Sequence, residues 1–313
     1  MIVGSVCMAH SPLLDRNRAA PEAEERFWAA LDKAADFVAE IEPDLTIVFH
    51  PDHVNGFFYK LLPMFCVGIG GRSVGDFGTA AGILDIPADR ALSCAEHVLQ
   101  QGVDTAISYR MDVDHGATQP VELLSSKIPV ARMIPIFINC ALAPRPSFAR
   151  VRALGAAVGQ WAANSPERIL IIASGGLSHD PPIPSLASAP PMVRQRLIEG
   201  GDLTHAQRMT RQNNVLGEGP KLAAGKSDLL PVDPVWDKML MDGFAAGDLS
   251  MLDGSTDEQI TAVGGRGGHE IRSWFAALSA LGAGGAGYKA EMQFYEQIDE
   301  WLTGMGIMTA RPA

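Results

Sequence analysis

Residues 133–174 hold two short apolar runs on either side of a helix-like segment: MIPIFIN (133–139), SFARVRALGAAVGQWAANS (147–165) and RILIIAS (168–174). The outer runs have the length and apolar character of buried strands. In the middle segment, apolar residues recur at the spacing of one helix face. Strands that alternate with helices are typical of an α/β sheet covered by helices on both faces.

The same alternation extends toward the N-terminus. Further strands are expected at 2–7, 45–49 and 103–109, and helices at 22–41 and 87–102. From residue 191 the pattern becomes mostly helical and strand patterns disappear. Because no repeat or linker interrupts the chain, we expect a single α/β domain over residues 1–313. It should have a central, mostly parallel sheet with helices on both faces and a helical C-terminal third.

Composition limits the kind of protein and its partners. The chain has 313 residues, of which 47% are hydrophobic and 19% charged, as in globular proteins. A net charge of −11 argues against broad binding to nucleic acid or to an anionic membrane, and an anionic substrate would need a local cation. We find no signal peptide and no apolar run long enough to span a membrane. Four scattered cysteines without a C-x-x-C pair indicate reduced thiols and a cytoplasmic protein.

Several histidines follow the expected strands. His10 comes after the first strand, His53 (with His50) after the second, His115 after residues 103–109, and His179 after residues 168–174. In an open α/β sheet, the loops beyond the carboxyl ends of the strands form the ligand crevice. The placement therefore predicts one site that several imidazoles share.

Imidazole is the commonest nitrogen ligand of transition metals. Two histidines and a carboxylate leave three positions of an octahedral ion open, as in non-haem Fe(II) oxygenases, whereas zinc hydrolases use the same ligand types. Glu270, in GGHEIRSW (267–274), is the candidate carboxylate and falls in the first turn of an amphipathic helix. The competing interpretation is that Glu270 only stabilises the start of this helix through the helix dipole. The ligand types alone leave iron and zinc open.

Glycine-rich segments do not indicate a phosphate or nucleophile site. The pieces GIGGRSVG (68–75) and GGRGGH (264–269) do not match a phosphate loop, and SGGLSH (174–179) does not match a nucleophile elbow. We expect turns at the first two pieces.

Five motifs in order resemble the class III (LigB-type) extradiol ring-cleaving dioxygenases. They are MAHSPLL, FHPDHVNGFFY, MDVDHG, SGGLSHDPP and GGHEIRSW, and the resemblance covers nearly the whole chain. It implies a non-haem Fe(II) enzyme that cleaves a 3-substituted catechol with O2, with 2,3-dihydroxyphenylpropionate or 2,3-dihydroxycinnamate as expected substrates. The expected product is a 2-hydroxy-6-oxo dienoic acid from aromatic compound catabolism. A homo-oligomer is also implied.

Carried over residue by residue, the resemblance makes His10, His53 and Glu270 the Fe(II) ligands. His179 becomes the base that deprotonates the catechol and His115 the acid that assists O–O cleavage, although these two roles could be exchanged. Asp114 could orient His115. Three residues are candidates for substrate binding: Asn55, Asp114 and Arg266.

Two rival interpretations remain at this stage. A zinc-dependent hydrolase would use the same ligand types, and an extradiol enzyme could act on a different catechol. A catalytically silent binding protein on the same fold should have lost a ligand or an acid/base residue, yet all five are present.

Overall fold

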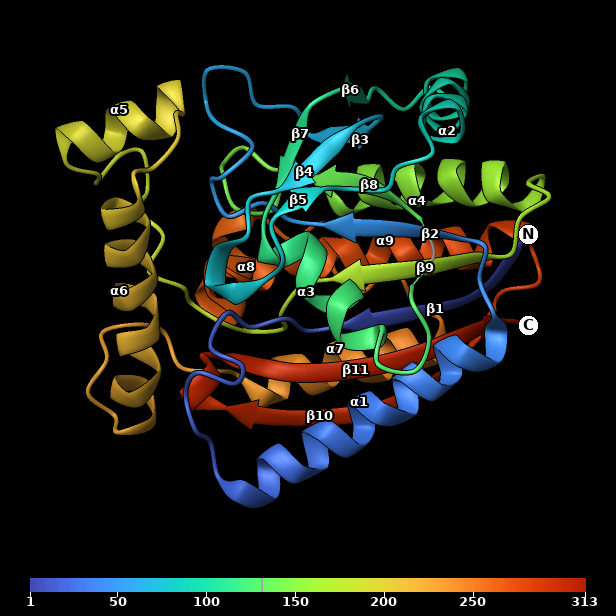
Figure 1. The fold of residues 1–313 in the computed structure, drawn as a ribbon. Helices are drawn as coiled ribbons and strands as arrows, with labels where there is room; N and C mark the ends of the chain where they lie inside the picture. The colour runs from blue at the N-terminus through green and yellow to red at the C-terminus, as the bar shows by residue number, and fades with distance from the viewer. Residues whose placement is uncertain (131) are drawn as a thin grey trace.

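The computed structural model describes residues 1–130 and 132–313 and has a large sheet between layers of helices (Figure 1). The longer helices are α1 (Pro21–Ile41), α2 (Ala88–Gln100), α3 (His115–Leu124), α4 (Phe148–Ala163), α5 (Pro191–Glu199), α6 (His205–Ala223), α7 (Pro234–Ala246), α8 (Asp257–Gly264) and α9 (Arg272–Leu281). The strands of the large sheet are β1 (Ile2–Met8), β2 (Leu45–His50), β3 (Phe65–Gly68), β6 (Ala106–Ser108), β8 (Met133–Ile138), β9 (Ile169–Ser174), β10 (Tyr288–Ile298) and β11 (Thr303–Pro312). The predicted α/β class is confirmed.

The large sheet has the order β10-β11-β1-β9-β2-β8-β3-β6. Its central strands β1, β9, β2 and β8 are mutually parallel, and β3 pairs in parallel with β6. The pairs β1–β11, β10–β11 and β3–β8 are antiparallel. The sheet is therefore mixed, with the parallel core that the sequence predicts.

Both faces of the central strands are buried under helices. In β9, Ile169 and Ile171 pack in the core cluster that contains α4 and α9, whereas Leu170 and Ile172 pack in the cluster that contains α1. Successive side chains of a strand point to opposite faces, so an uninterrupted apolar run needs cover on both sides. This explains why RILIIAS is so clear a strand signal.

The expectation that strands end before residue 191 is wrong. Helices do follow from α5 to α9, but β10 and β11 then return as antiparallel strands and extend the sheet beside β1. β10 is an edge strand with many half-exposed or exposed positions, so its sequence YKAEMQFYEQI has no apolar run. β11 is buried but contains Gly304 and Gly306, where a Cβ would lie 1.9 Å from Asp237 Oδ2 and 2.9 Å from Leu177 Cδ1. Glycines required by close packing weaken the strand pattern.

The region of residues 68–113 also differs from expectation. The predicted buried strand at 103–109 contains only the short β6, whose residues are largely exposed. The glycine-rich stretch at 68–75 was expected to form turns, but it includes β4 (Gly71–Ser73). β4 pairs with β5 (Gly82–Ile83) and β7 (Met111–Val113) in a second, three-stranded sheet. His115 therefore follows a strand of this small sheet rather than a strand of the large one.

The carboxyl ends of β1, β2 and β9 meet at one edge of the large sheet, and α6 stands beyond that edge (Figure 1). Within residues 1–130 and 132–313, no helix combines the length and apolar character needed to cross a membrane.

Candidate metal centre and active site

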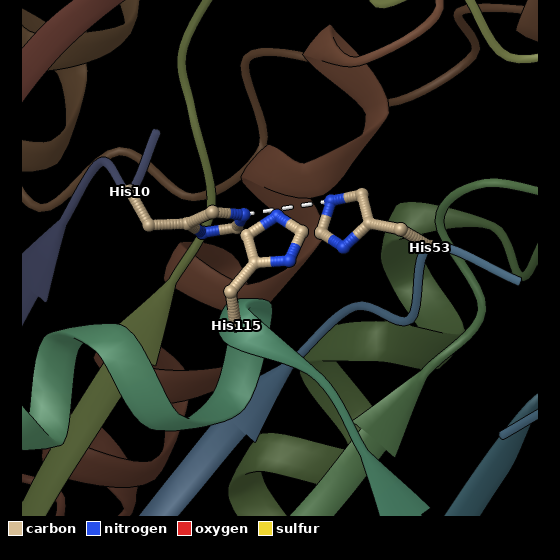
Figure 2. A group of neighbouring side chains, drawn as sticks. All are labelled: His10, His53 and His115. Atoms are coloured by element: carbon tan, nitrogen blue, oxygen red, sulfur yellow. Dashed lines mark hydrogen bonds between the residues drawn. The ribbon is translucent and has the colours of Figure 1, made fainter. Parts of the chain in front are cut away.

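Three imidazoles converge at this edge (Figure 2). His10 comes from the residues after β1, His53 from the loop after β2, and His115 from the first turn of α3. The Nε2 atoms of His10 and His53 lie 3.5 Å apart. The ring of His115 stacks on that of His53 with a centroid separation of 4.4 Å and meets the ring of His10 edge-on at 5.4 Å. The predicted gathering of strand-end histidines is present.

Glu270 supplies a carboxylate to the same point. It lies in a short 3-10 turn, Gly268–Ile271, that immediately precedes α9, rather than inside the α-helix itself. Its Oε1 is 3.2 Å from His53 Nε2, and its Oε2 is 3.7 Å from His10 Nε2. A Cβ on Gly175 would lie 2.6 Å from the Glu270 carbonyl oxygen, so a glycine there permits the close approach of the two segments.

His179 completes the group from the loop after β9. Its Nδ1 hydrogen-bonds with the Leu177 carbonyl at 2.9 Å, and its Nε2 lies 3.3 Å from Glu270 Oε1. A Cβ on Gly267 would lie 2.0 Å from this Nε2. The missing side chain of Gly267 thus makes room for the imidazole.

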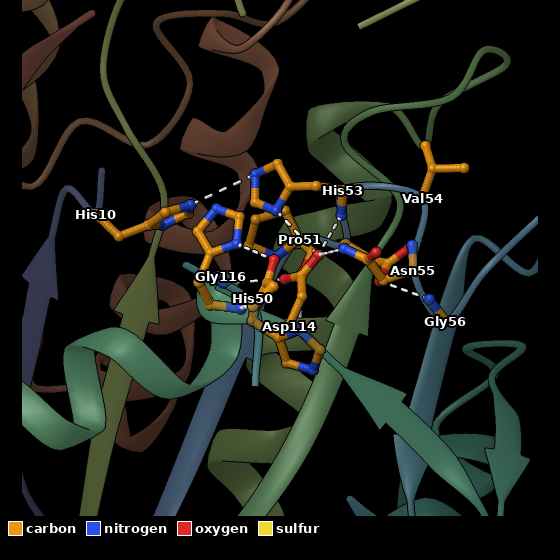
Figure 3. Close-up of polar contacts among 12 residues, drawn as sticks. His10, His50, Pro51, His53, Val54, Asn55, Gly56, Asp114 and Gly116 are labelled. Atoms are coloured by element: carbon orange, nitrogen blue, oxygen red, sulfur yellow. Dashed lines mark hydrogen bonds and ion pairs between the residues drawn. The ribbon is translucent and has the colours of Figure 1, made fainter. Parts of the chain in front are cut away.

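Asp114 holds His53 rather than His115 (Figure 3). Its Oδ2 accepts from the backbone N–H of His53 at 2.8 Å and lies 3.2 Å from the ring Nδ1. Its Oδ1 accepts from Gly116 N at 2.9 Å and so caps α3. The prediction that Asp114 orients His115 is wrong, because an N-cap side chain turns back toward its own helix start.

Asp76 orients His115 instead. Its Oδ2 is 2.7 Å from His115 Nδ1, and its Oδ1 accepts from the His115 backbone N–H at 2.8 Å. Both groups are buried, and the opposite ring atom, Nε2, has no hydrogen-bond partner among the described residues. Sequence reasoning missed Asp76, which directly follows the glycine-rich stretch 68–75. In VGDFG the aspartate stands alone between glycine-containing neighbours, so no residue spacing in the sequence indicated that it would contact His115.

His10 is fixed by a hydroxyl that the sequence did not single out. Its Nδ1 is 2.9 Å from Ser174 Oγ, at the end of β9. The bonds to Ser174 and to Asp114 engage the Nδ1 atoms of His10 and His53 and turn their Nε2 atoms toward Glu270. Partners on the far ring nitrogen commonly orient metal-ligating histidines.

The electrostatics of this group suit a cation. Burial lowers the pKa of His10 to about 3, so that ring is neutral. Burial opposes ionisation of Glu270, but the charge of His179 and bonds from His179 and His53 outweigh it and hold the Glu270 pKa well below its usual value. Asp114 behaves in the same way through His53. Among the described residues, no lysine or arginine forms an ion pair with either carboxylate. The same two carboxylates hold the pKa of His53 well above its usual value against the effect of burial, and a divalent metal ion would take the place of that proton.

The predicted substrate-binding residues have partners within the protein. The Asn55 side chain donates to Asp114 Oδ2 at 2.8 Å, and Asp114 itself is fully buried. Arg266 forms a two-pronged ion pair with Asp180, at 2.5 Å and 3.0 Å, and donates to the Ile183 carbonyl at 2.9 Å. Direct contact of these three side chains with a substrate stays a prediction.

A cavity of about 950 Å³ opens in front of the site, and its wall includes all four histidines. Phe77, Pro181 and Leu197 are among the apolar residues of that wall. A concave, mostly apolar chamber beside a few polar groups is the usual form of a small-molecule site.

Comparison with known proteins shows the family to which this chain belongs. Residues 4–306 match the family model described as the catalytic LigB subunit of aromatic ring-opening dioxygenase. This chain belongs to the LigB family. A Rhodococcus sp protein named 2,3-dihydroxyphenylpropionate/2,3-dihydroxicinnamic acid 1,2-dioxygenase is 46% identical over 310 residues, which cover 99% of this chain and 98% of the relative.

Other relatives carry the same name. The protein of Rhodococcus jostii RHA1 is 43% identical and covers 99% of this chain and 98% of its own length, and that of Mycobacterium sp. MCS is 46% identical with 97% coverage of both. The crystal structure of an uncharacterised Escherichia coli K12 protein aligns over 98% of this chain and 99% of its own, with 12% identity and a TM-score of 0.50, which bears on the fold alone.

Membership of the LigB family makes this protein a dioxygenase that opens an aromatic ring, and so confirms the resemblance seen in the sequence. It favours the dioxygenase over the hydrolase interpretation. A catalytic metal is implied, and the histidine–carboxylate cluster is where such an ion fits.

Proposed function

We propose that this LigB dioxygenase cleaves a catechol carrying a carboxylated side chain, namely 2,3-dihydroxyphenylpropionate or 2,3-dihydroxycinnamate, beside rather than between its hydroxyls. The names of relatives at 43–46% identity over nearly the full length support the substrate. The single observation that carries the reaction type is the convergence of His10, His53 and Glu270, of which the two histidines line the cavity.

His10, His53 and Glu270 would hold Fe(II). Two neutral nitrogens and one carboxylate form the ligand set typical of non-haem Fe(II) oxygenases. When bound, the iron supplies the Lewis acidity and redox chemistry that allow O2 to react with a catechol. A cluster of ligand atoms from His10, His53 and His115 is also compact. Because Glu270 contacts both other histidines and supplies the carboxylate of this ligand set, Glu270 is the better third ligand.

The two remaining imidazoles would move protons. In His179, the Nδ1 hydrogen is donated to the Leu177 carbonyl, and Nε2 lies 3.3 Å from Glu270 Oε1. With Glu270 engaged by the metal, this Nε2 would accept a proton from a catechol hydroxyl. His115 has its Nδ1 against Asp76 and presents its unpartnered Nε2 to the site, where it would donate a proton during O–O cleavage. The apolar wall would exclude water from the reacting ring.

Product analysis tests this function. Protein loaded anaerobically with Fe(II) and then given 2,3-dihydroxyphenylpropionate and 18O2 should release a yellow 2-hydroxy-6-oxo dienoic acid that contains both labelled oxygens. A muconate-type product from cleavage between the hydroxyls, or hydrolysis supported by Zn(II) without O2 uptake under Fe(II), would contradict it.

We also propose a cytoplasmic homo-oligomer. All four cysteines are free and buried, which supports the predicted reducing compartment. Sedimentation velocity on purified protein and fractionation of source cells test assembly and location, and a monomer or an exported protein would refute the respective proposal.

A further inference from the structure

Two arginines from the α5–α6 segment line the cavity in front of the histidines. Arg196 lies near the end of α5 and Arg211 in the first half of α6. Figure 1 shows both helices standing beside the sheet edge at which β1, β2 and β9 end. Both residues therefore line the chamber in which the ring would be bound.

Both arginines are anchored to the segment that carries His53. Arg196 Nη2 donates to the Val54 carbonyl at 3.1 Å. Arg211 Nη1 donates to Asn55 Oδ1 at 3.2 Å, and its Nη2 donates to the carbonyl of His53 itself. The two arginines thus bond to His53, a metal-ligand candidate, or to one of the two residues that follow it.

Their positive charge is not neutralised by an ion pair in the part of the chain that the structure describes. Within residues 1–130 and 132–313, neither Arg196 nor Arg211 forms an ion pair with a carboxylate, and the bonds above all go to neutral oxygens. The Nε of Arg196 is buried and has no hydrogen-bond partner among the described residues. Buried polar atoms without partners are rare and costly in folded proteins.

Two of the acidic groups near the pair have other partners, and a third is exposed to solvent. Glu199 also lines the cavity but pairs with Lys60 at 3.1 Å. Asp52 accepts three backbone N–H groups, from residues 55, 56 and 57. Asp202 is exposed at the rim.

Burial and the neighbouring Arg211 lower the pKa of Arg196 to about 10. The side chain therefore remains a cation at neutral pH. The chain as a whole has a net charge of −11. Two neighbouring cations that line one cavity therefore indicate that the cavity binds an anion.

We infer that Arg196 and Arg211 receive the carboxylate of the substrate's side chain. The inference rests on the proposed function, because it assigns a binding partner to the propionate or acrylate group of that substrate. A guanidinium offers paired N–H donors that match a carboxylate, and the bond is strengthened by charge and by the apolar wall. Because the arginines bond to His53 and to the two residues after it, a catechol bound at a metal on His53 would share one chamber with these cations.

The role of the arginines can be measured by comparing substrates with and without the carboxylate. The ratio of kcat/KM for 2,3-dihydroxyphenylpropionate to that for 3-propylcatechol should fall about 10- to 100-fold in Arg196→Met, the loss typical of one charge-assisted hydrogen bond. Arg196→Lys, which keeps the charge but not the fork, should give an intermediate ratio. Arg194→Met is the matched control: Arg194 lies on the same helix, is exposed and bonds to the Leu186 carbonyl. An unchanged ratio in Arg196→Met, or the same fall in the control, would overturn the inference.

A binding experiment separates this inference from the proposed function. Calorimetry on the wild-type protein without iron should show that 3-phenylpropionate, which lacks hydroxyls, binds more tightly than its neutral amide, and that added salt narrows the difference. Equal affinities would refute the arginine site even if the enzyme cleaves the catechol. If no catechol is cleaved but the acid is still preferred, the proposed function fails and the anion site stands.

Discussion

Individual residues in this site are fixed by carboxylates that sequence neighbours do not reveal. Asp114 adjoins His115 in the chain, yet its carboxylate binds His53, whereas His115 is held by Asp76, 39 residues away. Adjacent residues at a helix start point in different directions, so the sequence pairing was misleading. The positions of the four histidines and of Glu270 could be predicted, because these residues follow expected strands or lie in family motifs. Their partners could not, because only the folded chain brings them together.

Removal of the Asp76 carboxylate should impair proton transfer. In Asp76→Asn, the ring of His115 loses the partner that fixes its orientation, and we expect kcat to fall about 10- to 100-fold, with little change in KM or iron content. Steady-state kinetics and iron analysis check this result. Asp112→Asn is the matched control, because Asp112 lies on neighbouring β7 and pairs with Arg72 at the surface. Wild-type kcat in Asp76→Asn would show that His115 does not need this carboxylate.

Elements far apart in the sequence converge on His179. The loop after β9 carries the imidazole, and the turn before α9 passes against it at Gly267. The sequence predicted a turn at residues 264–269 but did not show which segment this turn approaches. Only the folded chain brings it against the loop after β9.

Gly267→Ala should displace His179. The new Cβ would lie 2.0 Å from its Nε2, so the imidazole or the turn must shift, and we expect at least a tenfold loss of kcat. Gly217→Ala in α6 has open space around its Cβ and should match the wild type in activity. Kinetics and thermal melting of both variants provide the measurement. Normal turnover in Gly267→Ala would mean that His179 tolerates displacement and is not the base.

Across the whole molecule, the parallel core was predictable and the C-terminal edge was not. Runs such as RILIIAS are buried on both faces and therefore apolar throughout, whereas β10 is partly exposed and β11 needs glycines at tight contacts. The single domain over residues 1–313 stays a prediction. The pairing of β1 with β11, from opposite ends of the chain, supports it.

Stability of the whole fold should depend on the protonation of Asp237, in α7. Its carboxylate accepts from Ser178 N at 2.7 Å, Ser178 Oγ at 2.8 Å and Tyr295 OH at 2.9 Å, yet burial raises its pKa to about 6. The folded state thus binds this proton more tightly than the unfolded state, where the pKa is 3.8. The free energy of unfolding should therefore fall as pH rises between these values, by about 3 kcal/mol from this group.

Asp237→Asn removes this titration, and the hydroxyls of Ser178 and Tyr295 can rotate to accept from the new amide. Urea unfolding of iron-free protein at about pH 4 and pH 7 should show a smaller loss of stability in the variant than in the wild type. Asp242→Asn, an exposed residue of the same helix that pairs with Lys238, should retain the wild-type dependence. Identical pH dependence in all three proteins would refute the role of Asp237.

The central claim is that His10, His53 and Glu270 hold Fe(II) while His179 acts on the substrate. The most direct test is iron content measured with O2 uptake after anaerobic loading of the wild type, Glu270→Ala and His179→Ala. We predict that the wild type retains iron and consumes O2 with the catechol, that Glu270→Ala retains no iron, and that His179→Ala retains iron without turnover. Full iron retention and turnover in Glu270→Ala would contradict the account.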